Sequence, residues 1–314
     1  MNKQKAEIAE RKNELKKRLY EYRMIYLLML PGIIFFIIMR YFPMVGLVMA
    51  FQNFTITRGI FGSEFVGFDN FSFFDSSFFW RALRNTFSIG LLRLAFSVPA
   101  ALVLALLLNE LRNLAFKKFV QTCSFLPFFL SWVVIATFTF GILSSDFGYL
   151  NTVIRQFGGE GRPWYLMPDI WQGILVGLNV WKNVGFGCIF YLAAIASINP
   201  EMYEAAYIDG AGRWKQFRYV TLPSLYSMIM IVLVLNVSFT LLADFEQIWS
   251  ITGSHDILRD QTSVLSTAIF EIGLQRGFFG QASAMGLFNS IIMCSMLLGA
   301  NFLARLLNKD YNLF

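Results

Sequence analysis

Charged side chains are scarce in this sequence. Lys, Arg, Asp and Glu make up 15% of the 314 residues, against about 25% in typical soluble domains. Hydrophobic residues make up 56%, aromatic residues 17%, and the mean hydropathy is +0.55. This composition argues against a soluble enzyme and indicates a chain that places much of its surface in lipid.

The residues that build metal and redox sites are also few. The three cysteines, Cys123, Cys188 and Cys294, lie far apart in apolar runs, which fits neither a disulfide framework nor the spacing of metal ligands. His255 is the only histidine and falls in a predicted loop, where we expect it to be solvated. We therefore predict no metal site and no catalytic residue.

A nucleotide-binding motif is missing as well. The sequence contains no G-x-x-x-x-G-K-[ST] phosphate loop, so this chain is not expected to bind ATP in the usual way. We predict that it binds no cofactor of its own, and any energy from ATP must then come from another polypeptide.

What the sequence has instead is long apolar runs. Six of them approach or exceed the roughly 20 apolar residues that a helix needs to cross a bilayer. They are about Met24–Tyr41, Thr86–Leu108, Phe119–Leu143, Ile170–Ile198, Leu222–Ala243 and Gln281–Leu303. Pro43–Phe54 is apolar but too short to span, and we interpret it as an interfacial segment. We predict an all-α polytopic membrane protein, with a basic segment at 1–23 and a six-helix transmembrane domain at 24–314.

The positive charge marks an orientation. The net charge is +6, and 16 of the 26 Lys and Arg residues fall in segments 1–23, 109–118, 199–221 and 304–314. The longer segments 42–84, 144–169 and 244–280 hold only seven. The positive-inside rule therefore places both termini and the 199–221 loop in the cytoplasm. Because the basic excess reports topology, it does not indicate a nucleic-acid partner.

The 199–221 loop contains signals for a short helix. Asn199 suits an N-cap, Pro200 the first helical position, and Glu201 the positive end of the helix dipole. Gly210 can end the helix in a left-handed conformation. We expect a helix of about 10 residues, then a second helical segment at Arg213–Tyr219 before the fifth span.

This loop resembles a known family motif. Glu204-Ala205-Ala206, Gly210, Val220 and Leu222-Pro223 match the EAA signature of importer permeases of ATP-binding cassette (ABC) systems, with Val220 where isoleucine is usual. The resemblance implies a coupling helix that docks on a separate nucleotide-binding subunit. The residues it implies for coupling are Glu204, Ala205, Ala206, Asp209, Gly210, Ala211, Leu222 and Pro223.

Other segments of the sequence resemble particular branches of this permease family. Phe65–Phe71 is similar to the WVGLxNF element of carbohydrate permeases, with Phe65 in place of tryptophan. Pro43–Phe51, Trp181–Phe186 and Asp209–Trp214 are similar to the lipoprotein-like, complex-polysaccharide branch. The resemblance implies a type I ABC importer permease in a bacterial cell membrane that moves a carbohydrate, and specifically an oligosaccharide, by alternating access. The implied partners are a second homologous permease, an ATPase dimer carrying ATP and Mg²⁺, and an extracellular solute-binding lipoprotein.

Polar residues within the spans are candidates for a substrate cavity, because they are costly in lipid. Lys182, between Trp181 and Asn183, could contact a sugar, or it could pair with Asp244 or Glu246 and only hold the bundle together. Asn289 is either a cavity residue or an interhelical hydrogen-bonding group. The candidate cavity residues are Trp181, Lys182, Asn183, Asn236, Phe239, Asp244 and Asn289.

Two other functions remain open at this point. One is a permease for a different polar solute, such as a peptide or an amino acid. The other is a polytopic membrane enzyme or sensor, which would need an intramembrane catalytic cluster.

Overall fold

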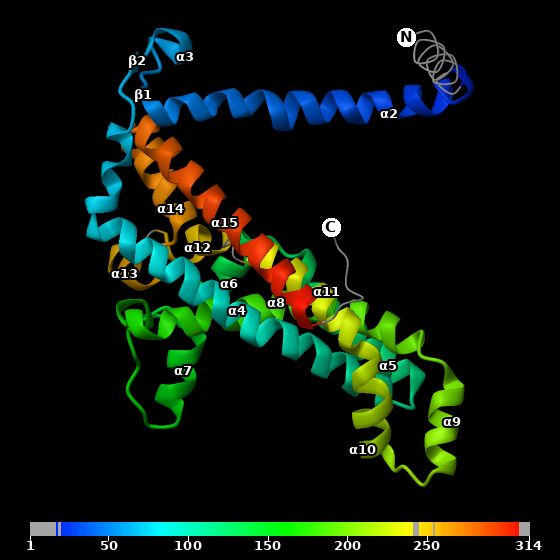
Figure 1. Ribbon diagram of the computed structural model, residues 1–314. Coiled ribbons are helices and arrows are strands. Elements are labelled where there is room, and N and C mark those ends of the chain that lie inside the picture. Colours follow the sequence, from blue (N-terminus) through cyan, green and yellow to red (C-terminus); the bar gives the residue numbers. More distant parts are fainter. Residues whose placement is uncertain (1–16, 18–19, 241–244, 254, 308–314) are drawn as a thin grey trace, which may run out of the picture.

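The computed structural model is almost entirely helical (Figure 1) and describes residues 17, 20–240, 245–253 and 255–307. Its two short strands, β1 (Gln52–Asn53) and β2 (Glu64–Phe65), pair antiparallel. The longer helices are α2 (Arg23–Phe36), α4 (Ser77–Glu110), α5 (Leu114–Phe125), α6 (Trp132–Leu143), α7 (Tyr149–Gln156), α8 (Trp171–Ala196), α9 (Pro200–Ile208), α11 (Leu222–Thr240), α12 (Phe245–Thr252) and α15 (Phe279–Leu307). The short ones are η1 (Ile37–Tyr41), η2 (Phe42–Phe51), α3 (Gly59–Gly62), η3 (Asp69–Asp75), η4 (Leu126–Phe129), η5 (Trp164–Leu166), η6 (Pro168–Ile170), α10 (Arg213–Gln216), η7 (Phe217–Thr221), η8 (Asp256–Leu258), α13 (Arg259–Thr262), α14 (Leu265–Phe270) and η9 (Glu271–Gln275).

Several predicted spans are confirmed. The second lies within α4, the fourth coincides with α8 to within two residues at either end, and the sixth lies within α15. Five helices in the described part of the chain are long and apolar enough to cross a membrane, or six if the bent pair at 114–143 counts as one span.

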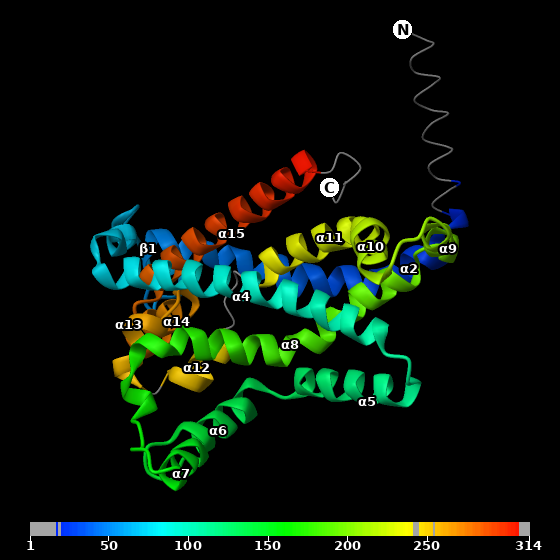
Figure 2. The ribbon, with the colours of Figure 1, turned by 90° about the horizontal axis from the view of Figure 1, so that it is seen from below.

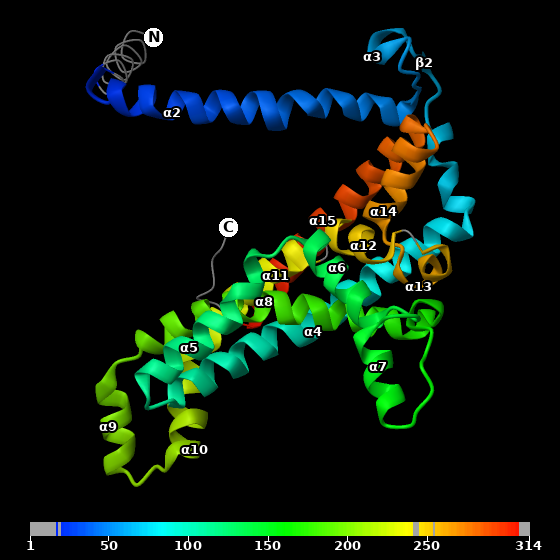
Figure 3. The ribbon, with the colours of Figure 1, turned by 180° about the vertical axis from the view of Figure 1, so that it is seen from behind.

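The first span is longer than predicted. One continuous helical run covers Arg23–Phe51, so the interpretation of Pro43–Phe54 as a separate interfacial segment is wrong for most of its length. The helical run continues past Pro43 because the helix type changes there. The π-helical turn η1 ends just before Pro43, which then lies in the first turn of η2. A missing N–H in a first turn breaks no hydrogen bond. The first part of this run, α2 with η1, forms an arm that stands away from the other helices (Figures 1 and 3), whereas η2 packs on α15; Figure 2 gives a view from below.

The third predicted span is not straight. α5 and η4 meet α6 at an angle of 102°, so the prediction of a single helix over Phe119–Leu143 is wrong. Pro127 lacks an N–H near the end of the first part, and the hydroxyl of Ser131 accepts a hydrogen bond from the Val134 N–H to begin the second. Hydropathy alone gives no sign of such a break.

The fifth helix begins earlier than predicted. The separate segment expected at Arg213–Tyr219 merges with the span, because α10, η7 and α11 form one helical run from Arg213. Its predicted end at Ala243 falls outside the described residues.

The long helices α4, α8, α11 and α15 run side by side, and the short helices gather at their two ends (Figures 1 and 3). α9 and α10 project at one end, while α7 and α13 lie at the other. Buried residues of α4, α8 and α11 form one core cluster, which includes Leu108, Tyr191 and Leu225. The stacked long helices thereby create the interior in which a cavity can form.

The segment between the strands and α4 is built on aromatic contacts. Phe65, Phe68 and Phe71 all surround Phe51, with ring centroids 5.6–6.4 Å apart. The Asn70 carboxamide donates to the carbonyls of Ala50 and Gln52 at 3.1 and 2.8 Å. The 65–71 element therefore anchors the end of the arm to the body of the protein.

His255 is packed rather than solvated, contrary to the sequence-based expectation. Its ring lies 4.3 Å from that of Tyr165, and burial lowers the pKa of His255 below its ordinary value of 6.5.

This burial predicts a loss of stability in acid. The unfolded chain takes up the His255 proton at a higher pH than the folded protein does, so the contribution of His255 to stability falls as the pH drops below about 6.5. We expect the apparent melting temperature of the purified protein to fall more between pH 7.5 and 5 than that of His255→Phe, which keeps the ring packing. Equal pH dependence in the two proteins would contradict this role.

Candidate functional site

The predicted coupling helix is confirmed as a helix, α9, with the capping predicted from its sequence. The side chain of Asn199 accepts a hydrogen bond from the Glu201 N–H at 3.1 Å, and Pro200 is the first helical residue. At the other end, the N–H of Ala211 donates to Ala206 O at 2.9 Å and the N–H of Gly210 donates to Tyr207 O at 3.0 Å. Gly210 has φ +76°. This is the Schellman arrangement, in which glycine favours the left-handed residue after the helix.

α9 presents most of its surface to solvent. Glu204, Ala205 and Asp209 are exposed, and the apolar Tyr207 and Ile208 are 75% and 84% exposed. One tether to the next helix is the Tyr203 hydroxyl, which lies 2.9 Å from the Thr221 hydroxyl. A short, well-capped helix with exposed apolar and acidic side chains is suited to docking on another protein.

The remaining residues of the signature lie on the helix that follows. Val220 is buried, Leu222 is half-buried and Pro223 is exposed at the start of α11. Arg213 of α10 forms a 3.3 Å ion pair with Glu110 at the end of α4. α9 is therefore linked to α11 through Tyr203 and to α4 through α10, two helices that also border the cavity described next.

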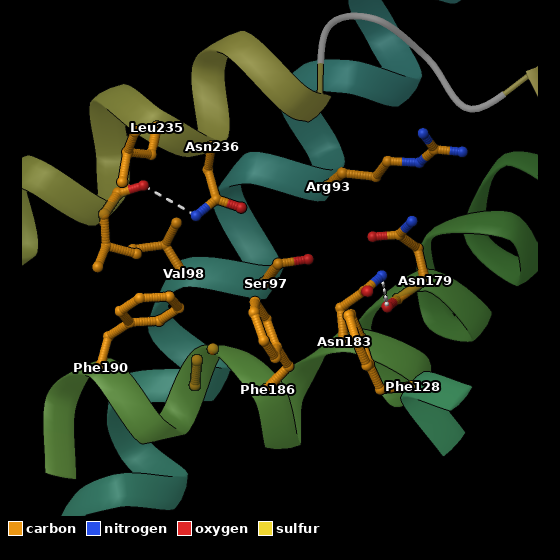
Figure 4. Close-up of a pocket in the computed structure, with 13 residues that line it drawn as sticks. Arg93, Ser97, Val98, Phe128, Asn179, Asn183, Phe186, Phe190, Leu235 and Asn236 are labelled. Atoms are coloured by element: carbon orange, nitrogen blue, oxygen red, sulfur yellow. Dashed lines mark hydrogen bonds between the residues drawn. The ribbon is translucent and has the colours of Figure 1, made fainter. Parts of the chain in front are cut away.

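A cavity of about 330 Å³ lies between α4, α8 and α11 (Figure 4). Polar side chains form part of its wall, and aromatic and aliphatic side chains form the rest. Its lining residues are Arg93, Ser97, Val98, Ala101, Phe128, Asn179, Asn183, Phe186, Gly187, Phe190, Val232, Leu235 and Asn236.

The polar part of the wall offers hydrogen-bonding atoms to the cavity. Asn183 donates to Asn179 O at 3.0 Å, and Asn236 donates to Val232 O at 2.8 Å. Within the described residues, neither carboxamide oxygen accepts a hydrogen bond, and the buried Ser97 hydroxyl has no partner. Figure 4 shows these three side chains directed toward the space between the helices. Buried polar atoms of this kind are ready to bind a polar solute or water.

The aromatic part is an ordered stack. The rings of Phe128 and Phe186 are 4.4 Å apart and nearly parallel, at 6°, and Phe190 meets Phe186 edge-on at 5.5 Å. Phe125 lies beside both rings, with centroids 5.9 Å from Phe128 and 6.2 Å from Phe186. Flat apolar faces and hydrogen-bonding groups thus line one cavity together.

Two of the lining residues, Arg93 and Asn179, are held by Gln247 of α12. This side chain is fully buried, and its oxygen accepts hydrogen bonds from Arg93 at 2.6 Å and Asn179 at 3.2 Å. Its nitrogen donates to Leu175 O at 2.7 Å. Arg93 is only 1% exposed, and its hydrogen bond to Gln247 links α4 to α12.

The structure brings together some of the predicted cavity residues and separates others. Asn183 and Asn236 line the cavity. Trp181 is on the opposite face of α8, 47% exposed, and Asn289 lines a different, much smaller void beside Thr86 and Leu265. Phe239 and Asp244 fall outside the residues whose side chains the structure describes.

Lys182 is buried beside the cavity but is not part of its lining. Its ammonium donates to the backbone carbonyls of Phe128 and Leu130. Glu246, named as one possible acidic partner, is exposed, and Asp244 lies outside the described residues.

Sequence reasoning missed several lining residues, although a signal was present. Asn179, Asn183, Phe186 and Phe190 follow one another at intervals of three or four along α8, and Arg93 and Ser97 are four apart on α4. Such spacing places them on one helix face. A helical projection of the polar residues would therefore have identified this wall.

An internal polar cavity between spanning helices, combined with a projecting docking helix, defines a membrane transport subunit. The comparisons with known proteins agree. Residues 97–312 match the family of binding-protein-dependent transport system inner membrane components, and the chain belongs to this family.

The relatives match over nearly the whole chain. The chain is 37% identical to Protein LplB of Bacillus subtilis strain 168, covering 91% of this chain and 90% of that protein. It is 36% identical to the polygalacturonan/rhamnogalacturonan transport system permease protein YteP of the same strain, covering 96% and 94%. A chain in the crystal structure of a bacterial ABC transporter involved in import of the acidic polysaccharide alginate aligns with a TM-score of 0.86 at 35% identity, covering 94% and 99%. The fold is that of a type I ABC importer permease.

Proposed function

We propose that this chain is the transmembrane permease subunit of an ATP-driven importer that carries an oligosaccharide into the cytoplasm by alternating access. The observation that carries the proposal is the cavity between α4, α8 and α11, whose lining combines amide oxygens with stacked aromatic rings.

The polar and the aromatic lining residues match the hydroxyl groups and the C–H faces of a sugar ring. Sugar hydroxyls can donate to the carboxamide oxygens of Asn183 and Asn236 and exchange hydrogen bonds with Ser97, while the C–H faces of the ring pack on Phe186 and Phe190. Among the described lining residues Arg93 carries the single charge. This lining suits neutral or acidic sugars better than cationic solutes.

Relatives support the same substrate class. YteP is named for polygalacturonan and rhamnogalacturonan transport. The arabinooligosaccharide permease AraP of Halalkalibacterium halodurans is 29% identical to this chain, and the match covers 85% of this chain and 83% of AraP. The solved transporter imports alginate, and a related structure contains a pentasaccharide-bound periplasmic protein.

The energy source is proposed to be an ATPase dimer, which would hold ATP and Mg²⁺ and receive α9. The coupling residues Glu204, Ala205, Ala206, Asp209, Gly210 and Ala211 lie on or directly after α9, with Leu222 and Pro223 at the start of α11. Exposed carboxylates at Glu204 and Asp209 offer acceptors to basic residues of such a partner.

A second homologous permease is proposed to cover the arm. Only 6% of the apolar window in Arg23–Phe51 is buried, and none of the residues of α2 is. The arm is attached to the body through η2, which packs on α15. Lipid can cover an apolar helix, but a second permease would bury this surface against protein.

The orientation follows from charge. α4 ends beside α10, where Glu110 pairs with Arg213, and α5 begins at the same end of the bundle (Figures 1 and 3). The basic residues Arg112, Lys117, Lys118 and Lys215 belong to these segments. We infer that this end, with both termini, faces the cytoplasm. The α7 and α13 end then faces outward, where an extracellular solute-binding lipoprotein would deliver the sugar.

Deletion of the gene tests the proposed function. We expect the deletion strain to lose ATP-dependent uptake of a labelled oligosaccharide, and a plasmid copy to restore it. The panel should include oligogalacturonates, arabino-oligosaccharides and, for the alternative function, oligopeptides. Loss of peptide uptake with all sugar uptake intact would replace the proposal with a peptide permease.

The polar wall predicts a defect in apparent affinity. Asn183→Leu and Asn236→Leu each remove one hydrogen-bond acceptor, and we expect each to raise the KM for oligosaccharide uptake about five- to tenfold, the equivalent of about 1–1.5 kcal/mol. Asn289→Leu is the matched control, since Asn289 lies outside the cavity, and its KM should change less than twofold. A larger effect at Asn289 than at Asn183 would place the substrate elsewhere.

A further inference from the structure

The break between η4 and α6 leaves backbone acceptors inside the protein. Where a helix ends, its last carbonyls have no intrahelical donor, and in a membrane span water is not at hand to replace them. The chain bends by 102° at this break, between Phe129 and Trp132. The carbonyls of Phe128 and Leu130 therefore need donors from elsewhere.

Lys182 supplies those donors from α8. Its ammonium donates to Phe128 O at 2.9 Å and also to Leu130 O. The charge is flanked by the rings of Phe128 and Trp132, with centroids 5.8 and 5.3 Å away, which stabilises a cation that is only 9% exposed. A cation at a helix C-terminus is also favoured by the helix dipole.

A second contact on α8 holds the segment before the break close to Lys182. One turn after Lys182, Gly185 packs directly against the backbone of Ser124 and Phe125 at the end of α5. The absence of a side chain lets the two helices approach closely. Lys182 and Gly185 thus hold the end of α5, η4 and the break against α8 at two adjacent points.

The geometry points to Lys182 as a positioning residue for the substrate cavity: it fixes the η4–α6 break and thereby places the ring of Phe128 in the aromatic wall. This inference rests on the proposed function, because it assigns the wall to saccharide binding. Phe128 both provides a carbonyl to Lys182 and stacks its ring on Phe186. When the carbonyl is released, the stack on Phe186 still connects the ring to α8, but the backbone that carries the ring has lost its hydrogen bond to Lys182.

The test uses the complete transporter in lipid nanodiscs and measures two quantities. The hydrogen-exchange rates of the backbone amides in 126–135 measure how stably the η4–α6 break is held. The KM and kcat of oligosaccharide uptake measure the state of the cavity. Lys182→Met preserves the length of the side chain without its donors. We expect exchange about tenfold faster and a KM raised about fivefold or more, with kcat changed less than twofold. Lys182→Arg, which retains a charged donor, should restore both quantities most of the way.

Two controls separate the steps of the argument. Phe128→Ala should raise KM while accelerating exchange much less than Lys182→Met does, because the donors of Lys182 remain. Lys118→Met, which changes an exposed lysine on α5, should change neither quantity. Unchanged exchange in Lys182→Met would overturn the role of Lys182 at the break. Faster exchange with an unchanged KM would overturn its role in placing the wall. If the wild-type transporter imports no saccharide, the proposed function fails, whereas the exchange measurement still decides whether Lys182 holds the break.

Discussion

Replacement of Gly210 by valine is expected to reduce substrate uptake more than tenfold while the protein still inserts and folds. Gly210 holds φ +76°, a region that costs a residue with a side chain about 1–2 kcal/mol and a β-branched one more. A methyl group at Gly210 would contact no atom within 4 Å. The penalty therefore acts on the backbone turn after α9 rather than on packing, and it should displace the docking surface without disturbing the core.

A graded series tests this reasoning. Asn tolerates the left-handed region better than other residues with side chains, so Gly210→Asn should keep most of the uptake, Gly210→Ala less, and Gly210→Val least. Uptake and substrate-stimulated ATPase activity of the assembled transporter should decline together along this order. Near-normal uptake with unchanged ATPase stimulation in Gly210→Val would refute the coupling role of the turn.

The coupling helix was predictable because its signals are local. Asn199 and Gly210 define the ends of α9 through hydrogen bonds to residues two or three positions away, and Pro200 occupies the first helical position. Such patterns can be read without knowing the fold. The long helices were predictable for a similar reason, since continuous apolar runs specify α4, α8 and α15.

The cavity was only half predictable. Asn183 and Asn236 were identified because polar residues in a span are expensive, but the same rule selected Trp181 and Asn289, which face other surroundings. Which side of a helix meets the cavity depends on how α4, α8 and α11 pack against one another. That packing is a property of residues distant in sequence.

Lys182 shows how a correct rule can suggest an incomplete explanation. A buried cation in an apolar span indicates a binding partner, and a sugar or an acidic residue was the natural expectation. Within the described residues, the structure supplies two carbonyl oxygens as partners, because the third predicted span is broken. Since the break was not predicted from hydropathy, the acceptors that it exposes could not be predicted either.

Replacement of Gly185 by alanine is expected to have a large effect on the stability of the protein. A methyl group at this position would overlap the carbonyl oxygen of Ser124 and lie 2.7 Å from the backbone nitrogen of Phe125. Backbone atoms cannot rotate away as a flexible side chain can, so α5 must separate from α8. We expect Gly185→Ala to destabilise the protein by about 1–3 kcal/mol and to lower the apparent melting temperature in detergent by several degrees.

The matched control lies on the same helix. A methyl group at Gly177 would meet no atom within 4 Å, and alanine is favoured over glycine in a helix by about 1 kcal/mol. Gly177→Ala should therefore be neutral or slightly stabilising, although both positions are helical glycines in one span. Because Lys182 reaches the η4–α6 break only while α5 lies against α8, Gly185→Ala should also accelerate hydrogen exchange in 126–135. Equal melting temperatures for the two variants would show that α5 does not depend on this contact.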